Sequence, residues 1–385
     1  MNLDLPESAS ILKNEARQFF ATEWSPTRAK AKDDHDHDSP ALWRRISELG
    51  WPGVIVPEVY GGSGDSFLAL LVLMQEVGRA AAAIPFFSTA AVGALSLLEG
   101  GTEEQKSNIL PGLCQGVTPT ALALSEPEVD FGLDHLTTSA SNTSNGYRIS
   151  GTKVFVSNAE SSSHLICVAK SVDHGGIQIF LIPQNDKTVS IRALMTTLDE
   201  RDFEVTFLDT QASLGSLLGA GAPAHLWFER VLQKSAIAKC AEMLGAGRKV
   251  LEMTVDHAKT REQFGKPIGS LQAVQHHCAN IATLIETAEM MTFRAGWKVD
   301  QNISFLTDAL KAKAWTNHAC RQAAALGHQV HGGIGFMHEY DLHLYTARMT
   351  SGALSFGRTP WCNDQIADHL FGPLTNSANR SLPRT

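Results

Sequence analysis

The sequence has no Cys-x-x-Cys pair, no apolar run of membrane-spanning length and no excess of basic residues. Its six cysteines are scattered, which argues against a disulfide framework or a zinc cluster and predicts reduced, mostly buried thiols. Residues 1–10 carry acids and no apolar segment, so we expect no secretory signal and a cytoplasmic protein. The formal net charge of −8 argues against nucleic acid as a general partner.

Apolar material is plentiful. Hydrophobic residues make up 43% and charged residues 19% of the 385 positions, enough for two or three domains with their own cores. Residues 33–38 read Asp-Asp-His-Asp-His-Asp, a run that metal ions can bind. A solvated loop is the better interpretation, because a flexible acidic loop has no preorganised ligand geometry. We therefore expect no metal site.

Apolar spacing predicts an α+β protein in three parts: an N-terminal helical domain over residues 1–118, a middle β-barrel-like domain over residues 119–212, and a C-terminal four-helix bundle within residues 213–385. Helices of the first part are predicted at residues 9–22, from Ser39-Pro40 to Gly50, at 67–83, at 89–99, and from Thr102 to about Pro111-Gly112.

The middle part changes to strand periodicity. Residues 147–158 are predicted to form a hairpin that turns at Ser150-Gly151. Further strands are predicted at residues 165–169, 177–182, 189–193 and 203–208. Bundle helices are predicted at residues 224–257, 271–298, 307–327 and 343–354, and residues 372–385 are typical of a frayed tail.

Two segments of the third part carry the functional signal. Residues 261–265 read Arg-Glu-Gln-Phe-Gly, and residues 329–336 read Gln-Val-His-Gly-Gly-Ile-Gly-Phe. Arginine offers a planar fork of donors to a diphosphate, and paired glycines let backbone approach a ligand closely. Together the segments resemble the FAD-binding segments of the acyl-CoA dehydrogenase family. The resemblance implies that FAD, bound mainly to a neighbouring subunit, is contacted by Arg261, Gln263, Phe264, Gln329, Gly332 and Gly333.

Two segments of the β domain extend the resemblance. Ser125, in a Leu-Ser-Glu-Pro stretch, matches the family's Thr-Glu-Pro segment at the flavin pyrimidine edge. Phe155 and Ser157 match the Trp-Ile-Thr segment, whose aromatic ring and hydroxyl lie beside the flavin ring. Serine replaces threonine in both segments and keeps the hydroxyl. The Gly-Ser-Asp that usually follows Thr-Glu-Pro is replaced by Glu-Val-Asp at residues 128–130, so one diphosphate contact of the family is missing.

The family's catalytic base is absent from both of its usual positions. In the family a carboxylate removes the proton alpha to the thioester while FAD takes hydride from the beta carbon. The commoner position, before a conserved glycine, is Phe356 here. The second position, on the long helix ahead of the arginine matched by Arg261, is Ser235. Neither side chain accepts a proton at neutral pH.

Several interpretations stay open. In the first, a partner chain supplies the base. Residues 338–345 resemble a bacterial branch that acts on steroid or alicyclic CoA esters, and that branch includes α2β2 enzymes. In the second, a displaced carboxylate is the base, with Glu242 and Glu229 as candidates. In the third, the chain keeps the fold but acts as a flavin-dependent monooxygenase. In the fourth, it is a structural subunit that completes a partner's FAD site. His331 is a further candidate base, although a packing role is the favoured interpretation.

The resemblance also implies the partners. These are an acyl-CoA substrate, an electron-transfer flavoprotein or similar electron acceptor, and further subunits in a homo- or hetero-oligomeric dimer of dimers. The bundle is expected to form the subunit interface, because the FAD segments act across it.

Overall fold

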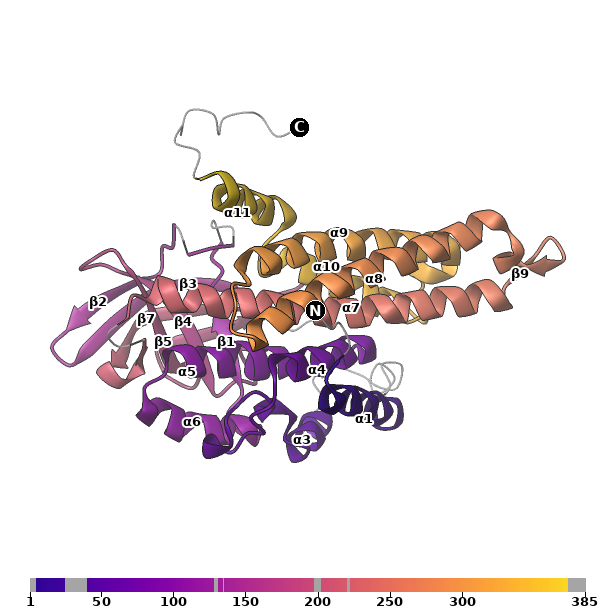
Figure 1. Ribbon diagram of the computed structural model, residues 1–385. Coiled ribbons are helices and arrows are strands. Elements are labelled where there is room, and N and C mark those ends of the chain that lie inside the picture. The colour runs from indigo at the N-terminus through magenta and orange to yellow at the C-terminus, as the bar shows by residue number, and fades with distance from the viewer. Residues whose placement is uncertain are drawn as a thin grey trace, which may run out of the picture.

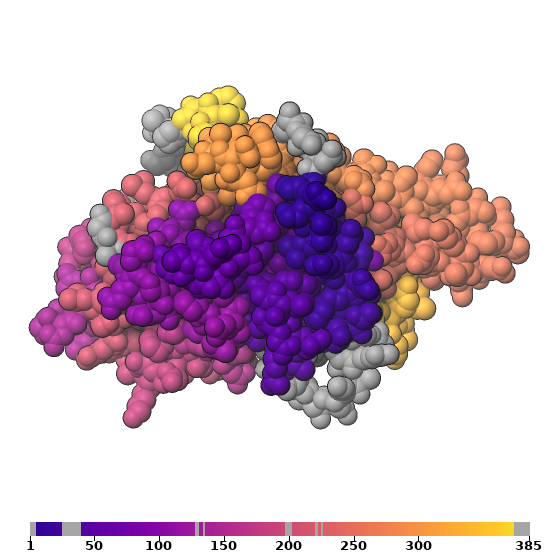
Figure 2. Space-filling model, turned by 60° about the horizontal axis from the view of Figure 1, so that its bottom comes forward, coloured from indigo at the N-terminus to yellow at the C-terminus, as the bar shows by residue number. Residues whose placement is uncertain are grey.

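The computed structural model describes residues 5–24, 40–127, 131–133, 135–196, 202–219 and 222–372. Helices of the N-terminal part lie beside a β-sheet, and a long helical bundle projects away from both (Figure 1). Figure 2 shows the N-terminal helices packed across the junction of sheet and bundle, with the far tip of the bundle extending beyond them. The acidic run at residues 33–38, Ser39 and residues 128–130 lie outside the described ranges.

The N-terminal helices are α1 (Glu7–Glu23), α3 (Pro40–Glu48), α4 (Phe67–Ala80), α5 (Ala94–Gly100) and α6 (Glu103–Cys114). Short 3₁₀ turns η1 (Trp51–Gly53) and η2 (Glu58–Tyr60) fill the loop after α3, and a π-helical segment η3 (Phe87–Gly93) leads into α5. Two predicted ends are wrong. Helix α4 stops at Ala80 because Ala81 takes a left-handed conformation (φ 47°), and α6 continues through Pro111 to Cys114.

The β domain contains β1 (Thr120–Ala123), β2 (Ser139–Thr143), β3 (Gly146–Ser157), β4 (His164–Ser171), β5 (Ile177–Pro183), β6 (Val189–Ala193), β7 (Asp202–Ser213) and β8 (Leu217–Leu218). Strands follow the order β6-β7-β3-β2-β4-β5-β8, and β1 pairs in parallel with β4.

The predicted hairpin turn at Ser150-Gly151 is wrong. Those residues lie inside the continuous strand β3, at a register shift against β7, and the chain turns earlier, between β2 and β3. Glycine is required at 151 for another reason: a side chain there would overlap Thr138. A strand glycine therefore marks close backbone approach and a bulge here, not a turn.

The four predicted bundle helices are present as α7 (Ala224–Thr260), α8 (Gln272–Asp300), α9 (Leu306–His331) and α10 (Leu342–Leu354). A further helix among the described residues, α11 (Thr359–Phe371), was not predicted and packs on α9 (Figure 1). A two-stranded ribbon, β9 (Glu262–Gln263) and β10 (Lys266–Pro267), joins α7 to α8. A 3₁₀ turn, η6 (Gly332–Phe336), follows α9. At 37 residues, α7 runs about 55 Å from the sheet to the bundle tip.

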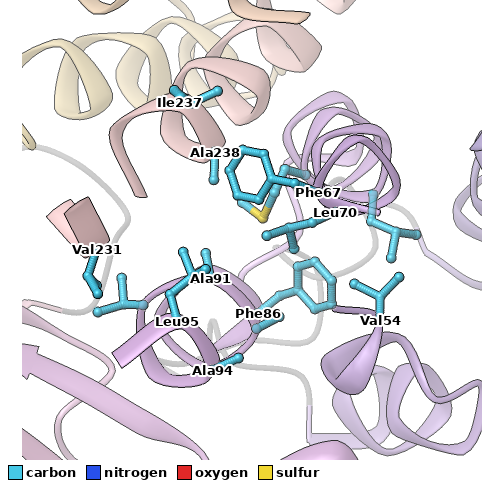
Figure 3. Close-up of a cluster of buried hydrophobic side chains, with 14 of the residues drawn as sticks. Val54, Phe67, Leu70, Phe86, Ala91, Ala94, Leu95, Val231, Ile237 and Ala238 are labelled. Atoms are coloured by element: carbon cyan, nitrogen blue, oxygen red, sulfur yellow. The ribbon is translucent and has the colours of Figure 1, made fainter. Parts of the chain in front are cut away.

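One hydrophobic core joins the three parts. Side chains of α4, η3, α5 and α7 meet there, including Phe67, Phe86, Leu95 and Ile237 (Figure 3). Helices α4 and α7 cross closely because Gly78 and Gly245 carry no side chain. A Cβ added at either glycine would overlap the backbone of the other helix. All six cysteines are free thiols and five are buried, which confirms the prediction for them. No helix among the described residues is both long and apolar enough to cross a membrane.

Candidate functional site

An aromatic cluster lies where η3, α11 and the turn after α10 meet. The Phe356 ring contacts Phe87 edge-on, with centroids 5.1 Å apart, and lies 6.0 Å from Phe131. Trp361 completes the cluster at 5.0 Å from Phe131. Phe356 has a left-handed backbone (φ 52°), an uncommon conformation for a bulky residue. Strained backbone of this kind concentrates at functional sites.

Ser235 lies on α7, the helix that packs on η3. Lys239, one helical turn later on the same face, holds its Nζ 3.8 Å from the centre of the Phe87 ring. Ser235 is fully buried, and its Oγ has no hydrogen-bond partner among the described residues. An unpaired buried hydroxyl costs about 1–3 kcal/mol, so the Ser235 hydroxyl is available to contact a bound group.

The two base positions predicted from the sequence thus converge on one region, and neither brings a carboxylate to it. Glu242 lies two turns beyond Ser235, but its carboxylate pairs with Lys239 and lies 3.8 Å from Arg348. Burial alone would raise the pKa of Glu242, yet these two cations outweigh it and lower the pKa. Glu242 is therefore an engaged anion, poorly suited to accept a proton. Glu229 is exposed near the start of α7, on a different face.

The flavin-edge residues predicted from the sequence lie together in the β domain. The Val154 amide donates to the Ser125 carbonyl over 2.9 Å and so joins the two predicted segments. Phe155 has a left-handed backbone (φ 55°) and is 62% exposed, an outward position for a large ring. The Ser157 hydroxyl donates to Asp202 over 2.6 Å, so its oxygen keeps accepting capacity.

A buried ion pair that the sequence analysis missed supports these residues. Glu126, next to Ser125, accepts from Lys153 Nζ (2.8 Å), from the Thr137 amide and hydroxyl (2.6 Å each), and from the Thr138 amide (2.9 Å). Burial acts to raise the pKa of Glu126, but the Lys153 and threonine hydrogen bonds prevail and lower it to about 2. The only sequence signal was the Ser-Glu-Pro stretch itself.

The dinucleotide segments meet at the opposite end of the bundle. Arg261 caps α7 at the surface, and the ribbon after it turns at Phe264 and Gly265, both with positive φ, as a two-residue turn requires. Phe264 is 88% exposed, and Gln263 is exposed beside it. The His257 ring, one turn before Arg261, stacks at 4.6 Å on His331.

That stacking brings the second segment alongside the first. Gln329 is exposed on the last turn of α9, and Gly332 follows with a left-handed φ of 62°. No atom of the described chain lies within 4 Å of where a side chain would begin at Gly332 or Gly333. This open backbone beside an exposed guanidinium suits a diphosphate and therefore fits the FAD segment predicted from the sequence.

His331 is a packing residue. Its Nδ1 lies 2.7 Å from the Gly327 carbonyl and its Nε2 lies 3.1 Å from the Tyr340 hydroxyl. Burial lowers its pKa more than its backbone hydrogen bonds raise it. With both ring nitrogens occupied far from the aromatic cluster, His331 is not placed to act as the base.

Comparisons with known proteins identify the family of the chain. Three family models match: the acyl-CoA dehydrogenase N-terminal domain over residues 6–117, the middle domain over residues 121–209 and the C-terminal domain over residues 226–371. Similar proteins include the probable acyl-CoA dehydrogenase YngJ of Bacillus subtilis, 29% identical over 89% of this chain and 92% of its own. The acyl-CoA dehydrogenase fadE12 of Mycobacterium bovis is 31% identical over 83% and 84%.

Solved structures also share the fold. Butyryl-CoA dehydrogenase of Megasphaera elsdenii has a TM-score of 0.89 at 24% identity, covering 96% of this chain and all of its own. The ChsE4-ChsE5 complex of Mycobacterium tuberculosis has a TM-score of 0.89 at 23% identity, over 96% and 99%. The Tcur3481-Tcur3483 steroid ACAD has a TM-score of 0.84 at 29% identity, over 94% and 97%.

Proposed function

The chain belongs to the acyl-CoA dehydrogenase family, and from this premise we propose that it is one subunit of a heteromeric enzyme whose partner chain supplies the catalytic base. The family is FAD-dependent and oxidises acyl-CoA thioesters. The observation that carries the proposal is the convergence of Phe356 and Ser235 on one region without a carboxylate.

The arrangement of the FAD residues supports an assembly of more than one chain. Ser125, Phe155 and Ser157 lie in the β domain, whereas Arg261 and Gly332 lie at the bundle tip, with most of the length of α7 between them (Figure 1). One dinucleotide does not bridge about 55 Å. The flavin edge of one chain and the diphosphate segment of another would therefore hold a single FAD.

The residues present define what this chain would do in catalysis. When bound, FAD would supply the hydride acceptor. Ser125 and Ser157 would hydrogen-bond its ring edge, and Phe155 would cover its ring. At the other end, Arg261, Gln263, Phe264 and Gln329 would hold the diphosphate and adenine, with the backbone of Gly332 and Gly333 allowing close approach. The aromatic cluster would wall the acyl group and exclude water, while removal of the alpha proton falls to another chain.

The substrate we propose is a CoA ester of a steroid or alicyclic ring, oxidised between its alpha and beta carbons. Support comes from the resemblance of residues 338–345 and from two structural relatives, one described as a complex of two named chains and one as a steroid ACAD. An electron-transfer flavoprotein, or a similar acceptor, is the proposed oxidant of the reduced cofactor.

A second candidate is a structural subunit whose own acyl site never turns over, and the absence of a carboxylate from the aromatic cluster favours it equally. Anaerobic titration separates the two. Excess acyl-CoA should bleach all the flavin absorbance of the assembled enzyme if both kinds of site act, and only a fraction of it if this chain is silent.

The test of the main proposal is expression of the chain alone and together with a neighbouring gene of the same family. Subunit composition, flavin absorbance and activity with a ferrocenium acceptor are then measured. We expect the chain alone to be slower by about 10²–10⁴-fold, the usual contribution of a general base. Co-expression should restore activity, and glutamine in place of the partner's glutamate should abolish it. Full activity of the chain alone would refute the proposal and direct mutagenesis to Glu242 and Glu229.

A further inference from the structure

The turn that carries Phe356 is held at both ends by two polar residues buried in the bundle. Lys313, on α9, donates from Nζ to the Gly352 carbonyl over 2.8 Å. Asn317, one helical turn later, donates from Nδ2 to the Gly357 carbonyl over 3.1 Å. The two side chains bond to each other, from Lys313 Nζ to Asn317 Oδ1, at 2.5 Å. Both are only 1% exposed.

Each contact goes to a backbone carbonyl at one end of the turn. Gly352 belongs to the last turn of α10, where carbonyls lack a partner within the helix. Its carbonyl accepts from the Ser355 hydroxyl over 3.3 Å and, over the shorter distance, from Lys313, which acts as a side-chain cap from a neighbouring helix. Gly357 follows the helix with φ 103°, and its carbonyl also receives the Cys362 thiol at 3.6 Å. The segment between them contains the left-handed Phe356.

A lysine in this position is costly to the fold. Burial lowers the pKa of Lys313 to about 8, and the groups around it are thiols, an amide and carbonyls. No carboxylate among the described residues forms a salt bridge with it. A buried cation without a counter-charge is retained only where surrounding structure compensates for it. Strained backbone likewise persists only when its surroundings fix it. The buried cation of Lys313 and the left-handed backbone of Phe356 both occur at this turn, and the same contacts hold both.

We propose that Lys313 and Asn317 are positioning residues that fix the turn at residues 352–357, so that side chain 356 points into the acyl site from a preset direction. The proposal rests on the proposed function for the identity of that site. In this chain the pair holds the Phe356 ring in the aromatic cluster. It follows that a carboxylate at position 356 would be presented from the same preset direction as the Phe356 ring.

Trp361 offers a readout that needs no catalysis. Its ring packs on Gly357, where an added Cβ would lie 2.9 Å from the indole, and it contacts Phe131 in the aromatic cluster. Incorporation of 5-fluorotryptophan and comparison with Trp361→Phe identify its ¹⁹F resonance in the intact assembly. Lys313→Met and Asn317→Asp should shift or split that resonance. Asn317→Asp replaces the amide donor by a carboxylate oxygen, which still accepts from Lys313 but faces the Gly357 carbonyl without a proton to donate. It therefore breaks the bond to the turn without leaving an empty cavity.

Lys298→Met is the matched control. Lys298, on α8, also bonds a residue of α9: its Nζ donates to Asp308 over 2.5 Å. Asp308 lies in the first turn of α9, before Lys313, and none of its hydrogen bonds or salt bridges among the described residues reaches the turn at residues 352–357. Lys298→Met should leave the Trp361 resonance unchanged. If Lys313→Met does not fold, the Trp361 resonance of Asn317→Asp is the test of the proposal. An unmoved Trp361 resonance in folded Asn317→Asp would overturn the proposal.

The kinetic arm uses Phe356→Glu, which places a carboxylate on the preset turn. This variant alone should desaturate acyl-CoA without a partner about 10²–10⁴-fold faster than wild type. Adding Asn317→Asp should lower kcat at least tenfold with little change in KM, because orientation of the base changes and CoA binding does not. Equal activity of the single and double variants would overturn the positioning role. An inactive Phe356→Glu with a moved Trp361 resonance would instead contradict the assigned acyl site and leave the positioning role intact.

Discussion

Replacing Glu126 by glutamine should destabilise the β domain strongly, because it leaves a buried ammonium without its counter-charge. Glu126 is 3% exposed and Lys153 is fully buried. The pKa of Glu126 is lowered from 4.5 to about 2. Each tenfold change in proton affinity is worth about 1.4 kcal/mol, so the ionised carboxylate contributes about 3 kcal/mol at neutral pH. Removing one partner of a buried pair typically costs ~3–5 kcal/mol, which agrees.

The pH dependence gives the sharper test. The folded-state pKa of Glu126 lies below its ordinary value, so its stabilisation is complete above about pH 5 and is lost as pH falls from 4.5 towards 2. Urea unfolding of wild type and Glu126→Gln, at one protein concentration and at a series of pH values, should show curves that converge in acid. The double variant Glu126→Leu/Lys153→Met removes both charges and should recover much of the loss.

A control is available on the surface. Glu103 is an exposed carboxylate that contacts Tyr60 and Lys106, and Glu103→Gln should leave the unfolding midpoint nearly unchanged. If Glu126→Gln lies within about 0.5 kcal/mol of wild type at pH 7, or if its deficit is as large at pH 3 as at pH 7, the buried pair does not stabilise the segment beside Ser125 as described.

Three further predictions concern the cofactor and the missing base. Arg261→Ala should weaken FAD retention about ten- to a hundredfold, because it removes a charge-assisted contact of roughly 1.5–3 kcal/mol. The measurement is flavin dissociation from the assembled enzyme, and an unchanged dissociation constant would show that the diphosphate site is misplaced. Gly333→Val should lower FAD content while leaving the apo-protein's thermal stability intact, because no atom of the described residues lies within 4 Å of a Cβ added at Gly333. A matching loss of stability would assign that glycine to folding instead. Ser235→Glu should give the isolated chain measurable desaturation, since a carboxylate there projects from α7 towards the aromatic cluster, and silence in folded, FAD-loaded protein would contradict the register assigned to α7.

Local patterns sufficed for much of this chain. Apolar spacing located the four bundle helices to within a few residues. Each of these helices buries one stripe of its surface, so its apolar residues recur every three or four positions in the sequence. The proposed FAD segments were visible for a similar reason. Arg261, Gln263, Gly332 and Gly333 would bind the cofactor through chemistry that their residue types carry with them. The turn predicted at Ser150-Gly151 was wrong because glycine occurs both in turns and where backbone segments approach closely. Only the position of Thr138 in the fold shows that close approach is the reason here.

Tertiary structure decided the rest. Phe356 and Ser235 were identified separately, but only folding packs α7, the helix of Ser235, against η3, whose Phe87 contacts Phe356. Glu242 was a candidate base until Arg348, more than a hundred positions away in the sequence, placed a second cation near its carboxylate. The Glu126–Lys153 pair and the Lys313–Asn317 clamp gave no sequence signal of their roles. A charge acquires its pKa and its function from groups within a few ångströms, and the sequence alone does not say which distant residues those will be.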